Sequence, residues 1–279
     1  MSTLWDLNMT SLIHFILIAM LMFPAAAHAG RHQEYIKEIS QSVETLTEDK
    51  IPRLIKKAEA GDKKAELLLG MAYFYGKGAK QDYREANKWF RKAAEHGDVV
   101  AQYQLGVDYA AGLGGEKDFA EGARWYTKAA RQGYAEAQFR LGTHYKMGEG
   151  VPLDYPAAVK WFRKAADQGH AEAQWSLGIM YQGGGGVTQS DAEALKWYRK
   201  AAEQGFARAQ YFVATMYQTG RGVPADLTTA YMWFKIAQVS GEPSAERFLV
   251  ELALKMPPED VETALKKADE WLKQHPAAK

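Results

Sequence analysis

Apolar residues recur along the chain with the spacing of amphipathic helices, in segments separated by pairs of glycines. In the first segment, Ala65, Leu69 and Tyr73 lie four residues apart and therefore share one helix face. A Gly-x-Gly sequence follows, and glycine ends a helix readily because it adopts the left-handed conformation without strain. A second segment then presents Ala86 and Phe90 on one face. The pattern predicts a helix-turn-helix hairpin.

This hairpin recurs with a strict register of 36 residues. Three register positions keep their residue type: a glycine after the second helix, a tryptophan in the second helix that an aromatic residue follows, and a tyrosine in the first helix. The residues are Gly61, Gly97, Gly133, Gly169, Gly205 and Gly241; Trp89, Trp125, Trp161, Trp197 and Trp233; and Tyr73, Tyr109, Tyr145, Tyr181 and Tyr217. A catalytic residue is normally needed once, so this repetition predicts a structural role.

Capping residues mark the start of each second helix. Asp or Ser stands at the N-cap position, where a side-chain oxygen accepts unpaired backbone N–H groups; these residues are Asp82, Asp118, Asp154, Ser190 and Asp226. In three copies an acidic residue follows three positions later, namely Glu85, Glu121 and Glu193. This spacing predicts a capping box, in which the acid also accepts from the N-cap backbone.

An isolated hairpin of this kind cannot bury its apolar face, so the copies must stack. The sequence therefore predicts an all-α fold, an α/α superhelical solenoid of about five repeats over residues 61–255. Residues 30–60 are expected to form an N-terminal capping helix and a half-repeat. Residues 256–279 are expected to supply a C-terminal capping helix, from Glu259 to about Gln274.

The N-terminus has a different composition. Residues Leu12 to Phe23 form an apolar run, interrupted only by His14, that is shorter than the roughly 20 residues that span a bilayer. Ala27 and Ala29 fit the small-residue pattern of a signal-peptidase site. We therefore expect residues 1–29 to be a secretory signal peptide, cut between Ala29 and Gly30, with a periplasmic or secreted product and no stable membrane span. An uncleaved anchor is the alternative, and a start at Met9 would shorten the leader.

Composition excludes several kinds of site. The net charge of +1 and the lack of a Lys/Arg-rich run argue against nucleic-acid binding. Without cysteine the chain has no thiolate nucleophile, no disulfide, no cysteine zinc site and no lipid attachment of the lipoprotein type. Metalloprotease, nucleophile-elbow and Walker motifs are missing from the sequence. The sequence predicts no enzyme activity, no cofactor and no metal site.

The consensus of the copies, A-E-A-Q-aromatic-x-L-G-x-x-Y-x-x-G-x-G, later W-aromatic-x-K-A-A-x-x-G, resembles the Sel-one-like repeat, a relative of the tetratricopeptide repeat. The resemblance extends from Gly61 to about Lys255. It implies an α/α superhelix whose first helices line the concave side. It also implies a non-catalytic adaptor that holds a protein or peptide partner.

Two first-helix positions differ between copies and are expected to face outward into that groove. They predict a partner-binding surface made of Gln104, Asp108, Arg140, His144, Ser176, Met180, Phe212 and Met216. Its middle would be polar and its C-terminal part apolar, with methionines that adapt to different ligands. An extended or helical partner segment would fit such a surface.

Two alternatives belong to other functional classes. His144 and Asp108 share one register position, and a His–Asp pair can orient a general base, as in a hydrolase or cell-wall-active enzyme. No nucleophile stands at the equivalent positions. Trp175 could stack on a sugar in a glycan- or peptidoglycan-binding module, although its register position favours packing between repeats.

Overall fold

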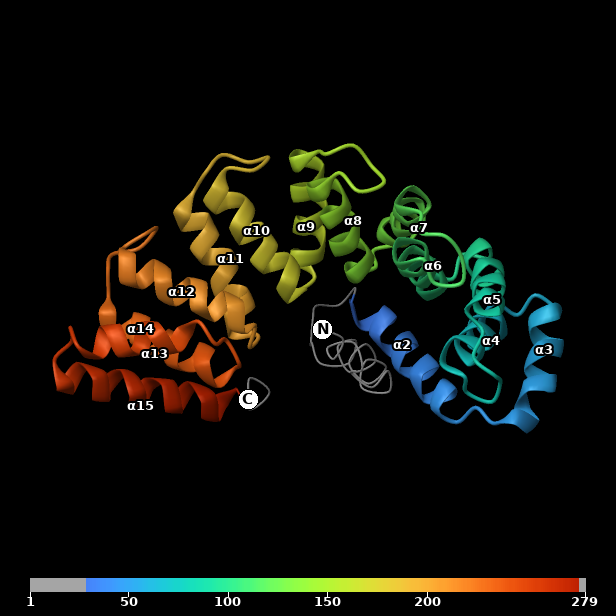
Figure 1. The fold of residues 1–279 in the computed structure, drawn as a ribbon, viewed down its shortest axis with the longest axis horizontal. Helices are drawn as coiled ribbons and strands as arrows, with labels where there is room; N and C mark the ends of the chain where they lie inside the picture. Colours follow the sequence, from blue (N-terminus) through green and yellow to red (C-terminus); the bar gives the residue numbers. More distant parts are fainter. Residues whose placement is uncertain (1–28, 276–279) are drawn as a thin grey trace, which may run out of the picture. The chain divides into compact units, whose positions relative to one another are not determined.

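The computed structural model describes residues 29–275, so the predicted signal peptide lies almost wholly outside the described residues. Between residues 29 and 275 the ordered elements are α-helices and one short 3₁₀-helix (Figure 1). Within this part of the chain, no helix has the length and apolar character that crossing a membrane requires. The chain divides into two compact units, Met1–Asp154 (unit 1) and Tyr155–Lys279 (unit 2).

Unit 1 begins with a long helix that precedes the repeats. Its elements are α2 (Ala29–Glu44), η1 (Glu48–Lys50), α3 (Ile51–Glu59), α4 (Lys63–Tyr75), α5 (Tyr83–Glu95), α6 (Val99–Ala111), α7 (Phe119–Arg131) and α8 (Ala135–Met147). Each helix from α3 to α7 packs against the next one along the chain. α3 precedes α4 and packs against it, as a second helix does in the repeats; the assignment of residues 30–60 as a cap and half-repeat stays a prediction.

Unit 2 continues the same alternation of first and second helices. Its elements are α9 (Tyr155–Asp167), α10 (Ala171–Gly183), α11 (Asp191–Glu203), α12 (Ala207–Thr219), α13 (Leu227–Val239), α14 (Ala245–Ala253) and α15 (Pro258–Gln274). Each helix from α9 to α13 again packs on its successor, whereas α15 packs on α13. The all-α, solenoid-type stacking of helix hairpins is thus confirmed within each unit.

Glycine and tyrosine close each hairpin. Both glycines of the turn after α6 have positive φ, 76° at Gly112 and 73° at Gly114. A Cβ at Gly114 would also lie 2.6 Å from the carbonyl oxygen of Tyr83, at the start of the preceding second helix. The carbonyl of Tyr109 accepts the backbone N–H of Asp118 at 2.8 Å, and the same bond recurs in every repeat. The turn therefore needs glycine for its conformation and for close packing.

That recurring bond explains why the capping-box prediction is wrong. The N-cap side chains accept as expected; Asp118 Oδ1, for example, takes the N–H groups of Ala120 and Glu121. The backbone N–H of Asp118 already donates to the carbonyl of Tyr109, so it is not available to the Glu121 carboxylate. The Glu121 carboxylate instead bonds Arg124 and the indole of Trp125.

Aromatic rings of the second helices fill the space beside glycines of the first helices. A Cβ at Gly106 would come within 2.5 Å of the Tyr126 ring, and Gly70 and Gly178 meet Phe90 and Tyr198 in the same way. The register indoles are buried at Trp125, Trp197 and Trp233 and half-buried at Trp89 and Trp161. The core prediction is therefore confirmed in its main features.

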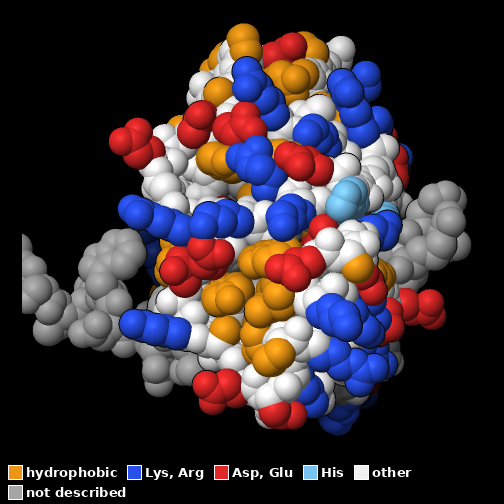
Figure 2. Space-filling view, turned by 90° about the vertical axis from the view of Figure 1, so that its right-hand side faces the viewer, with side chains coloured by type: hydrophobic (Ala, Val, Ile, Leu, Met, Phe, Trp, Pro, Cys, Tyr) orange, Lys and Arg blue, Asp and Glu red, His pale blue; other side chains and the backbone are white. Residues whose placement is uncertain are grey.

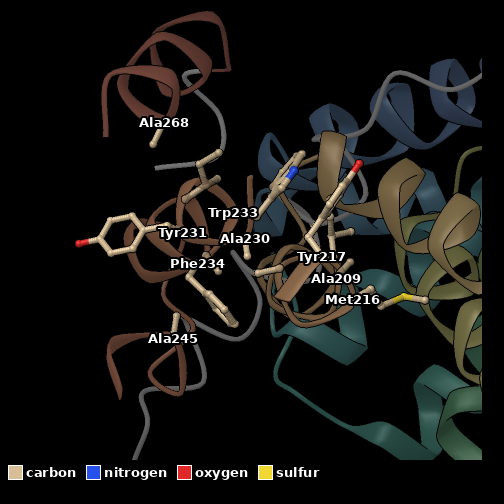
Figure 3. Close-up of a cluster of buried hydrophobic side chains, with 14 of the residues drawn as sticks. Ala209, Met216, Tyr217, Ala230, Tyr231, Trp233, Phe234, Ala245 and Ala268 are labelled. Atoms are coloured by element: carbon tan, nitrogen blue, oxygen red, sulfur yellow. The ribbon is translucent and has the colours of Figure 1, made fainter. Parts of the chain in front are cut away.

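A cluster of buried apolar side chains forms the core of α11 to α15 in unit 2 (Figure 3). Phe234 has no exposed surface, and Trp233 meets Trp271 of α15 edge to face at 5.5 Å. Ala245 and Ala268 enter the cluster from α14 and α15. Small residues at these points let the end helices approach closely.

Glutamine side chains add polar ties between successive hairpins. In four copies a buried glutamine of the first helix donates to a carbonyl near the end of the preceding second helix; the pairs are Gln102–Ala94, Gln138–Ala130, Gln174–Ala166 and Gln210–Ala202. The first copy has Glu66 at this register, and its buried carboxylate lies 2.8 Å from His96 Nδ1. A buried polar group is tolerated where it is hydrogen-bonded.

Candidate partner-binding face

The sequence predicts the partner surface on the first helices, which are α4, α6 and α8 in unit 1 and α10, α12 and α14 in unit 2. The outer side of these helices in each unit is here called the first-helix face. Only two of the eight predicted side chains reach solvent: Arg140 is exposed and Phe212 is half-buried. The other six are buried, namely Gln104, Asp108, His144, Ser176, Met180 and Met216. The expectation that all eight face outward is therefore wrong, and their partner-binding role stays a prediction.

The turn that ends each first helix explains part of this burial. His144 Nδ1 lies 2.7 Å from the carbonyl oxygen of Glu149, which belongs to the turn after α8. In the copy that contains α10, the methyl end of Met180 lies against Gly185 of its own turn. Side chains one turn before the helix end are therefore covered by the chain that follows them, a tertiary effect that helix periodicity does not contain.

Asp108 is the most unusual of the buried residues. Its side chain is 1% exposed, Oδ1 accepts a hydrogen bond from Gln104 at 2.8 Å, and Oδ2 has no hydrogen-bond partner. Burial raises the pKa of Asp108 to about 7, against a smaller lowering by the Gln104 bond. The carboxyl group is therefore partly protonated near neutral pH.

The proposed His144–Asp108 pair does not form a hydrogen bond. His144 Nδ1 bonds the Glu149 carbonyl, and its ring lies 5.3 Å from the ring of Tyr126. Asp108 Oδ1 is bonded to Gln104 and Oδ2 is unpartnered. A general base needs an orienting acid within hydrogen-bond reach, so this geometry gives the hydrolase alternative no support.

An element that the sequence analysis treated only as an end cap lies on the first-helix face of unit 1. The helix α2 pairs Glu38 with Lys64 of α4 at 2.5 Å, and Tyr35 donates to Asp98, the N-cap of α6, at 2.5 Å. Further along, the His32 ring meets Tyr134 at 5.9 Å, edge to face. α2 therefore crosses the N-terminal ends of three successive first helices.

The stripe of α2 that is turned toward the repeats is mainly apolar. Ile36, Ile39, Ser40 and Val43 are buried, at spacings of three and four residues. Burial, together with the charge of Asp98, raises the pKa of Tyr35 above its ordinary range, so the phenol remains a donor. A repeated i, i+3, i+4 pattern over residues 36–43 was the sequence signal that could have identified this interface.

Charges of both signs are mixed on the surface. Figure 2 shows one face on which Lys and Arg side chains alternate with Asp and Glu and surround small groups of hydrophobic side chains. Elsewhere in the described residues, charges of opposite sign pair along single helices, as Lys88 does with Glu85 and Lys255 with Glu251. The face seen in Figure 2 has no continuous basic field of the kind that attracts nucleic acid.

Comparison with known proteins agrees with this architecture. The Sel1 repeat family model matches residues 63–98, 99–134, 135–170, 171–206 and 207–237. A Sel1 repeat protein from Oxalobacter formigenes is 33% identical, with a TM-score of 0.65 and coverage of 75% of this chain and 85% of that one. A putative Sel1 repeat protein from Klebsiella pneumoniae is 22% identical, with a TM-score of 0.44 and coverage of 72% and 98%. None of the curated proteins compared matches the chain. On the five matched repeats, the chain belongs to the Sel1 repeat family.

Proposed function

We propose that the protein is a non-catalytic interaction scaffold that binds a segment of a partner protein on its first-helix face. Sel1 repeat proteins generally act as protein-interaction scaffolds, which supports the class of function. The observation that carries the proposal for this chain is the docking of α2 across α4, α6 and α8, because it gives an example of helix binding on that face.

Among the eight residues predicted for the partner surface, Arg140 and Phe212 are the two that a partner would touch directly. Arg140 is exposed and paired with Glu136 on its own helix at 2.9 Å, so its guanidinium keeps donors for a second acceptor. The six buried residues would shape the face from beneath.

The site of action that we propose is the bacterial envelope or the secreted space. The apolar run from Leu12 to Phe23 and the Ala27-His28-Ala29 sequence support export with cleavage before Gly30. Expression of the full chain in a bacterium, followed by fractionation and N-terminal sequencing, tests this part. A product that retains Met1 in the cytoplasm would refute export.

Site-specific crosslinking tests the scaffold function. A photoreactive amino acid at position 140 or 212 should crosslink a defined protein in the cells that make this chain. The same group at Arg84, an exposed residue of a second helix, is the matched control. The partner identified by mass spectrometry should then bind the purified chain. Equal crosslinking from position 84, or none from 140 and 212, would refute the proposal.

A further inference from the structure

A row of aromatic side chains runs across the first-helix face of unit 2. We call it the aromatic strip and define it as Trp175, Phe206, Tyr211, Phe212 and Phe248. Neighbouring rings pack together. The centre of the Trp175 ring lies 5.8 Å from that of Phe206 and 6.3 Å from that of Phe212, and the ring centres of Tyr211 and Phe248 lie 5.6 Å apart. All five side chains are half-buried, so part of each ring remains open to solvent.

Two aromatic residues at these register positions are buried in unit 1. Tyr103 stands at the register of Trp175 and Tyr211, and Tyr134 stands at the register of Phe206. These two tyrosines are only 6% and 5% exposed, and the His32 ring of α2 lies on Tyr134. Phe139 shares the register of Tyr103 but is half-buried, so two of the matching aromatic positions in unit 1, Tyr103 and Tyr134, are buried while those of unit 2 are half-open.

The charged positions that hold α2 are also matched in unit 2. Lys64, which pairs with Glu38, corresponds four repeats later to Arg208, and Asp98, which accepts from Tyr35, corresponds to Glu242. Arg208 is exposed, and its guanidinium carbon lies 5.8 Å from the centre of the Trp175 ring. The sign of the charge is kept at both positions.

We propose that the aromatic strip binds an amphipathic helix of a partner protein with the chemistry of α2. The aliphatic stripe of the partner helix lies on the aromatic rings. An acidic residue of that helix pairs with Arg208, and a hydroxyl group one turn away donates a hydrogen bond to Glu242. The inference rests on the proposed function and names its partner class. A partner supplies the helix because the chain's own α2 is engaged on unit 1.

A peptide of residues 29–46 provides the probe, since the matched charges predict that it fits the strip. A lactam between Lys37 and Gln41→Glu, both exposed positions, holds it helical, because a helix of this length is marginal in water. The labelled peptide is titrated into the full chain and its binding is followed by fluorescence anisotropy. We expect saturable binding with a Kd below about 1 mM.

A charge exchange locates the site. Arg208→Glu should weaken binding of the peptide about tenfold, because like charges then face each other. A peptide carrying Glu38→Lys should bind the R208E chain better than it binds the wild type. Arg84→Glu is the control for a change of net charge alone and should leave binding unchanged.

Three outcomes would overturn the inference. The first is no saturable binding of the peptide. The second is weaker peptide binding to the Lys64→Glu chain and unchanged binding to the R208E chain. The peptide would then bind unit 1 by displacing α2. The third is a dimer of the chain alone that R208E dissociates, since a second copy would then supply the helix. Crosslinks from position 140 or 212 that persist in any of these cases would leave the scaffold function standing.

Discussion

Asp108 allows a test of the buried face of unit 1 through the pH dependence of stability. Its pKa is about 7 in the folded protein, against an ordinary value of 3.8, and burial is the main cause. Between these two values the folded chain keeps a proton that the unfolded chain has lost. Stability therefore falls as pH rises from about 4 to about 7, and stays reduced above that range.

The size of the effect follows from the shift. One pKa unit corresponds to about 1.4 kcal/mol, so a shift from 3.8 to about 7 lowers the free energy of unfolding by at most about 4 kcal/mol at alkaline pH. Asp108→Asn keeps the carbonyl that accepts from Gln104 and removes the ionisation. It also places a buried amide where Oδ2 has no partner, a penalty that does not vary with pH.

The informative quantity is thus the difference between two pH values. Urea unfolding of D108N and wild type at about pH 5 and about pH 8.5 should show D108N gaining about 2–4 kcal/mol relative to wild type at the higher pH. Glu116→Gln is the control, since Glu116 is exposed and its removal changes net charge equally. The same difference between D108N and wild type at both pH values would refute the argument.

Three further substitutions test the packing and the polar ties of unit 1. Gly106→Ala should destabilise the chain by about 1–3 kcal/mol in urea unfolding, because its Cβ meets the Tyr126 ring at 2.5 Å; a smaller loss in a Tyr126→Leu background would confirm the clash as the cause. His96→Ala should cost about 1–3 kcal/mol by leaving the buried Glu66 carboxylate without its partner. The double change E66Q/H96Q recreates the Gln–Gln pair of other repeats and should unfold near the wild-type midpoint. A loss of stability in E66Q/H96Q as large as that in H96A would contradict this. Trp125→Ala should cost about 3–5 kcal/mol, since the indole is 3% exposed, and a thermal melt that matches wild type would rule out its core role.

The repeat architecture was predictable because its signals are local and occur several times. A 36-residue register, glycine pairs and N-cap residues each act within one hairpin, and five copies average out the exceptions. The N-cap at Asp118 and the ring–glycine contact at Gly106 appear as such local rules require.

The candidate face was predicted less well because exposure is a tertiary property. Variation between copies predicts that a residue faces outward, yet Asp108 and Met216 are 1% exposed. Variation there reflects different ways of filling a buried position. The docking of α2 was missed for a related reason: its partners Lys64 and Asp98 lie 26 and 63 residues from their α2 contacts, beyond any helical periodicity.

The last repeat lacks the packing of a small residue against an aromatic ring that the earlier hairpins have. The register that holds Gly70, Gly106 and Gly178 holds Val250 in α14, and the register of the partner ring holds Glu270 in α15. Ala214 shares this register and α13 still packs on α12, so the place accommodates one methyl group, whereas valine brings a larger, branched side chain. α15 accordingly packs on α13, with Trp271 against Trp233, and Val250 remains 61% exposed. A glycine or alanine therefore stands at this register wherever the next helix continues the stack, and valine stands where the stack ends.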